Sequence, residues 1–87
     1  MNLNAFRDAI DAIDDQLMEI LLKRMEISKQ ISEYKKDNNL PTRDRQRELQ
    51  MIANRTESIE DPLVKDALTD VLEAILKASR HVQDGTK

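Results

Sequence analysis

Apolar side chains recur every seven residues along the N-terminal part of the chain, from Leu3 to Tyr34. No Pro or Gly interrupts this segment before Pro41, so the pattern predicts one helix over about residues 4–37. At ~1.5 Å per residue this helix would be roughly 50 Å long, about twice the ~25 Å diameter of a compact domain of this length. We therefore expect the helix to need a partner. The a and d positions of the heptad are Leu3, Phe6, Ile10, Ile13, Leu17, Ile20, Arg24, Ile27, Ile31 and Tyr34.

Two shorter helices are predicted after the turn Asn38-Asn39-Leu40-Pro41. One covers about residues 44–55, with Thr42 or Asp44 as its N-cap, and a polar connector over 56–60 follows it. The other covers about 62–83, because Asp61-Pro62 places a capping carboxylate before a proline at the first helical position. Residues 84–87 are expected to fray. The apolar stripe of this last helix is Leu63/Val64, Ala67/Leu68, Val71/Leu72 and Ile75/Leu76, and its continuation reaches Ser79 and Gln83.

The composition agrees with an all-α fold. One Gly, two Pro and no Trp suit a few long helices better than a sheet with many turns. The 87 residues fit a single domain, residues 1–87. A core of this size supplies little stability and the chain has no Cys for a disulfide, so regular helix packing within a homodimer is the expected solution.

Charge and hydropathy exclude several classes of partner. The net charge is −3, with 14 Lys and Arg against 17 Asp and Glu, so no basic field exists to attract nucleic acid. The N-terminus carries acids where a signal peptide is apolar, and no run approaches the roughly 20 apolar residues that span a bilayer. We expect a cytoplasmic protein without a membrane partner. With one His and no Cys, no metal site is expected.

Arg24 stands where the heptad requires a hydrophobic residue, and a buried guanidinium needs an anion. Lys35 lies 11 residues later, so both cations face nearly the same way on a helix and can hold two ends of one anion. Two structural alternatives remain for Arg24: a register-setting polar residue, or a buried ion pair with an acid such as Glu48. Lys35 alone can equally point to water near a helix end.

Two further groups of polar residues have the same ambiguity. Ser79 and Gln83 lie one turn apart on an apolar stripe, and are either functional or the solvent-facing end of a fraying helix. The charged run that contains Arg43, Arg47 and Glu48 is either part of a site or a solvated face with local ion pairs.

As a set, these residues resemble the motif of the bacterial-type all-helical chorismate mutases, over about Leu3 to Gln83. The resemblance implies an intertwined homodimer with three helices per chain and a long first helix. It also implies an isomerase that converts chorismate to prephenate, for phenylalanine and tyrosine biosynthesis, without a cofactor or a metal. The residues that carry the resemblance are Arg7, Arg24, Lys35, Asp44, Arg47, Glu48, Ser79 and Gln83.

The resemblance also implies roles for these side chains. Arg24 and Arg7 would clamp the substrate carboxylates, with Arg7 supplied by the other subunit. Lys35 and Gln83 would donate to the ether oxygen as its C–O bond lengthens. Ser79 would assist a carboxylate contact.

Of the remaining three residues, two would hold the ring of the substrate. Glu48 and the backbone of Asp44 would bind the ring hydroxyl, while Arg47 would orient and neutralise nearby acids. Three alternatives stay open: an isochorismate pyruvate lyase on the same fold, a non-catalytic helical dimerisation module, and a regulatory or fused mutase-like domain. For the last of these, 87 residues leave no room for an attached domain.

Overall fold

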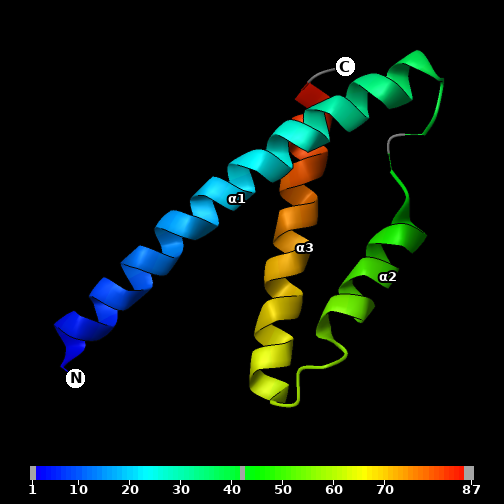
Figure 1. Ribbon diagram of the computed structural model, residues 1–87. Helices are drawn as coiled ribbons and strands as arrows, with labels where there is room; N and C mark the ends of the chain where they lie inside the picture. The colour runs from blue at the N-terminus through cyan, green and yellow to red at the C-terminus, as the bar shows by residue number, and fades with distance from the viewer. Residues whose placement is uncertain (1, 42, 86–87) are drawn as a thin grey trace.

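The computed structural model describes residues 2–41 and 43–85, and all its regular structure in those ranges is α-helical (Figure 1). The three helices are α1 over Leu3–Asp37, α2 over Arg45–Thr56 and α3 over Pro62–Gly85. The predicted all-α class with three helices is confirmed, and each boundary lies within two residues of its expected position.

Both ends of α1 are fixed by asparagines. The side chain of Asn2 accepts a hydrogen bond from the backbone N–H of Ala5 at 2.9 Å, which caps the N-terminus. At the other end Asn39 adopts a left-handed φ of 53°, which Asn tolerates better than most residues. The N–H groups of Asn39 and Leu40 then bond back to the carbonyls of Lys36 and Lys35. This pair of bonds is a Schellman motif, and it ends α1 at the predicted place.

Carboxylates begin the two shorter helices. Asp44 caps α2 by accepting from the backbone N–H of Arg47 at 3.1 Å, so the predicted Asp44 cap is confirmed. The alternative, Thr42, lies outside the described residues. Asp61 accepts from the N–H of Leu63 at 2.9 Å at the start of α3, as its position before Pro62 predicted.

The C-terminal ends of these two helices differ from expectation. Thr56 was assigned to the connector, but it is the last residue of α2. Its buried hydroxyl donates to the carbonyl of Ile52 at 2.8 Å, and this local bond allows a polar residue to finish the helix below the surface. In the same way, residues 84 and 85 were expected to fray but continue α3 to Gly85.

α3 packs against both other helices, while α1 and α2 do not pack on each other in the described part of the chain. In Figure 1 the N-terminal half of α1 extends well beyond α2 and α3, and the molecule measures 54 × 26 × 15 Å. Residues 2–20 are exposed except for the half-buried Ala5. The predicted overhang of the first helix is therefore present.

The apolar heptad seam does not form a core within one chain. Its apolar members are 41–63 % exposed. The α1 residues that are buried instead are Ser28 and Ser32, whose small side chains allow α1 and α3 to cross closely. Among the described residues, only two hydrophobic residues are buried, Ile52 and Leu76. No helix in the described ranges is long and apolar enough to cross a membrane.

Candidate active site

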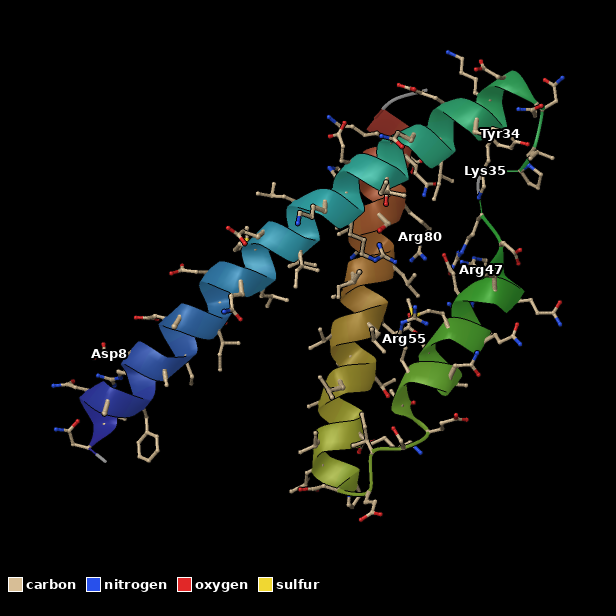
Figure 2. The ribbon with its side chains drawn as sticks, in the orientation of Figure 1. Asp8, Tyr34, Lys35, Arg47, Arg55 and Arg80 are labelled. Atoms are coloured by element: carbon tan, nitrogen blue, oxygen red, sulfur yellow. The ribbon has the colours of Figure 1, made fainter. Side chains whose placement is uncertain are left out.

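A cavity of about 390 Å³ lies between the diverging helices α1 and α2, against α3. This volume falls within the ~300–1,000 Å³ range of sites for small molecules. Figure 2 shows Lys35, Arg47, Arg55 and Arg80 directed toward the space that the three helices enclose. Seven of the eight site residues expected from the sequence line the cavity: Arg24, Lys35, Asp44, Arg47, Glu48, Ser79 and Gln83.

Arg24 is held in place from α3. Its guanidinium donates a hydrogen bond to the hydroxyl of Ser79, which is buried at the crossing of α1 and α3. No carboxylate among the described residues forms an ion pair with Arg24, and Glu48 pairs with other arginines. The predicted alternative of an Arg24–Glu48 pair is therefore wrong.

The crossing also fixes the far end of α3. The buried hydroxyl of Ser32 donates to the backbone carbonyl of Gln83 at 3.0 Å. Gln83 and Ser79 are 9 % and 6 % exposed. The alternative that these two residues are the solvent-facing end of a fraying helix is therefore wrong. Their position beside α1 brings both polar side chains to the wall of the cavity.

Lys35 reaches the cavity from the last turn of α1, where it is half-buried. It therefore does not simply point to water. In Figure 2 its side chain extends from α1 toward α2. The backbone carbonyl of Lys35 accepts one of the two bonds of the Schellman motif, so this residue lies in the last turn, two positions before α1 ends at Asp37.

Asp44 and Arg47 lie at the start of α2. The carboxylate of Asp44 is already used as the helix cap, so its side chain has less freedom to bind a ligand. Arg47 is exposed and lines the cavity. Among the described residues it makes no ion pair with an acid, and its expected role toward nearby acids stays a prediction.

Glu48 is surrounded by three arginines. Its Oε2 accepts from Nη1 of Arg80 at 2.7 Å, and its Oε1 lies 3.5 Å from both Arg43 Nε and Arg45 Nη1. Burial acts to raise the pKa of Glu48. The hydrogen bond and charge of Arg80, together with the charge of Arg43, outweigh burial and hold the pKa below the ordinary glutamate value. The charged run containing Glu48 is therefore not merely a solvated face.

Two arginines that sequence reasoning missed also line the cavity, Arg55 on α2 and Arg80 on α3. Burial lowers the pKa of Arg24, and the nearby charge of Arg55 lowers it further. The lining thus carries five cations against the carboxylates of Asp44 and Glu48, a net of three positive charges. Such a cavity favours an anion with more than one negative charge.

Arg7 is the one expected site residue that does not line the cavity of its own chain. It lies on the exposed half of α1, 17 residues before Arg24, which is about 25 Å along a helix. In the described part of the chain no cluster of His, Asp or Glu is suited to hold a metal ion.

Residues 6–84 match the family model described as chorismate mutase type II. The chain belongs to this family. The predicted resemblance is confirmed. The matched range covers α2, nearly all of α1 and α3, and every residue that lines the cavity.

Curated relatives agree with the family. The chain is 36 % identical to the T-protein of Enterobacter agglomerans over 78 residues, which cover 88 % of this chain and 21 % of that protein. It is 31 % identical to the T-protein of Haemophilus influenzae over 78 residues, which again cover 88 % of this chain and 21 % of that protein. It is 43 % identical to the bifunctional chorismate mutase/prephenate dehydratase of Buchnera aphidicola over 54 residues, 62 % of this chain and 15 % of that protein. The chain spans about a fifth or less of the length of these relatives.

Proposed function

We propose that this chain catalyses the rearrangement of chorismate to prephenate in aromatic amino-acid biosynthesis. The observation that carries the proposal is the cavity itself, in which cations from all three helices meet two buried polar side chains of α3. Family membership supplies the substrate class, and the cavity has the charge that a dianion requires.

The reaction is an intramolecular rearrangement, so the protein has to provide geometry and electrostatic stabilisation rather than a nucleophile or a base. The enolpyruvyl arm must fold over the ring while the ether C–O bond breaks and a new C–C bond forms. Arg24, which Ser79 orients, is suited to hold a carboxylate in this folded shape. Lys35 and Gln83 are suited to donate to the ether oxygen as negative charge develops there.

We also propose that the working form is a homodimer in which Arg7 enters the partner's cavity. The apolar seam of α1 is exposed over its whole length in one chain, and an unpaired stripe of this size is typical of an interface. Because Arg7 lies far from its own cavity, it can complete a site only across such an interface.

Loss of chorismate ultraviolet absorbance, with the product identified, tests the activity. We expect prephenate from the wild-type chain and a loss of about 100-fold or more in kcat for Lys35→Ala, as for the removal of other transition-state donors. Lys36→Ala is the matched control, since Lys36 does not line the cavity. Folded protein that releases salicylate and pyruvate from isochorismate would instead be a lyase. Protein that acts on neither compound, and that Arg24→Leu stabilises, would be a dimerisation module.

Mixing inactive variants tests the shared site. Arg7→Ala and Arg24→Ala homodimers should each be inactive, but their heterodimer keeps one site with both arginines. Random exchange makes half of the dimers heterodimers with one intact site of two, so about a quarter of wild-type activity should return. Arg24→Ala mixed with Lys35→Ala is the control, because both residues belong to the same cavity and no intact site forms. Equal recovery in the two mixtures would refute a shared site.

A further inference from the structure

Arg80 lies at the centre of the cavity wall on α3, directly after Ser79, and belongs to no role that the family resemblance implies. Figure 2 shows its side chain projecting from α3 toward α2. It lines the cavity and remains 25 % exposed, although one of its nitrogens is bonded to Glu48. A guanidinium has five N–H donors, so most of its donor capacity is still available to a ligand.

Glu48 lines the cavity and fixes Arg80 there. Its Oε2 accepts from Arg80, and its Oε1 lies 3.5 Å from both Arg43 and Arg45, with less than 1 Å² of accessible surface. The carboxylate is therefore already paired with arginines on both of its oxygens. Because the pKa of Glu48 is held below its ordinary value, the carboxylate stays ionised at neutral pH and remains paired with Arg80.

We propose that Arg80 is a further substrate-binding residue, oriented by Glu48, that donates hydrogen bonds to an oxygen of the bound dianion from the α3 side of the cavity. Glu48 is then a positioning residue that acts through Arg80. This inference rests on the proposed function, because the dianion is taken to be chorismate. It places this contact beside the position where the family resemblance expects Glu48 and the backbone of Asp44 to bind the ring hydroxyl.

The alternative is that Arg80 only neutralises Glu48. Arg45 provides a matched control for this alternative, because it also pairs with Glu48 but does not line the cavity. If Arg80 binds the substrate, Arg80→Met should raise the KM for chorismate about tenfold or more, as expected for loss of a charge-assisted hydrogen bond. Arg45→Met should leave KM near the wild-type value, and Arg80→Lys should recover part of the loss.

The double variant Arg80→Met, Glu48→Gln separates binding from stability. Removing Arg80 takes from Glu48 its closest partner and leaves it with Arg43 and Arg45, whereas removing both members of the part-buried pair is less costly. We therefore expect urea midpoints to fall for Arg80→Met and to recover in the double variant, while KM stays raised. Recovery of both the midpoint and KM in the double variant would overturn the inference. Equal KM values for Arg80→Met and Arg45→Met would also overturn it. Wild-type protein without activity on chorismate would instead refute the proposed function.

Discussion

Ile13 tests whether the exposed seam of α1 is an interface. Its side chain is 61 % exposed in one chain, and the residues around it on α1 contact neither α2 nor α3 (Figure 1). Ile13→Ala removes three carbons, worth about 2.4 kcal/mol when fully buried. A dimer interface can bury only the part of the Ile13 side chain that is exposed in one chain. Multiplying the free energy by this exposed fraction gives about 1–1.5 kcal/mol per chain. A twofold dimer loses the contact in both copies, so the total of about 2–3 kcal/mol should weaken association roughly 30- to 150-fold.

Sedimentation equilibrium over a range of protein concentrations measures this change. Asp15→Ala is the control, since Asp15 lies at the f position of the heptad, opposite the seam. The activity of Ile13→Ala should also become dependent on protein concentration, because each cavity would need Arg7 from a partner. Equal dissociation constants for the two variants would refute the seam as the interface. A wild-type chain that is monomeric and fully active would refute the homodimer altogether.

Three further substitutions have effects of known sign. Arg55→Met should stabilise the chain by about 0.3 kcal/mol at low salt, because it removes repulsion with Arg24 at a solvent-screened site; loss of this gain in 1 M salt would confirm its origin, and a lower urea midpoint would contradict it. Glu48→Gln should lower the free energy of unfolding at neutral pH. The folded pKa of Glu48 is depressed, so this deficit should shrink as pH falls below the ordinary glutamate value of about 4.3, and a deficit independent of pH in urea titrations would argue against it. Gln83→Glu should confine activity mainly to acidic pH, because a carboxyl donates only when protonated; an unchanged pH–rate profile would remove Gln83 from the ether-oxygen role.

The helix boundaries were predictable because the signals that set them are local. Asp61-Pro62 begins α3, and the Asn38-Asn39 pair ends α1, each through bonds to residues within a few positions in the chain. The position of Thr56 was missed because its hydroxyl bonds within its own helix, and nothing in the sequence distinguishes this from a polar connector.

Pairing between helices was less predictable. The sequence indicated four site residues through its apolar patterns. Three of them interrupt an apolar stripe: Arg24, Ser79 and Gln83. Lys35 was indicated because it faces the same way on its helix as Arg24. Arg80 interrupts no apolar pattern, and Glu48, its partner in the structure, lies in a run of charged residues. Their bond depends on how α2 and α3 cross, which heptad positions and capping signals do not specify.

The closest packing in this chain is polar, and this explains why its cavity can be so cationic. Of the described residues that are buried, Ile52 and Leu76 are apolar and the other five are Ser28, Ser32, Thr56, Ser79 and Gln83. The serines of α1 let α3 approach closely enough for two interhelical hydrogen bonds, from Arg24 to Ser79 and from Ser32 to Gln83. These two bonds fix how α1 and α3 cross, because each bond forms in only one register of the two helices. Aliphatic side chains at the same positions would pack in several registers. Most of the apolar surface that a chain needs for stability is left on the seam of α1 before Arg24, while Ile27 and Ile31 of the seam line the cavity. A net positive cavity wall is therefore compatible with folding, because most of the surface expected to stabilise the protein precedes the cations of α1 that would bind the substrate.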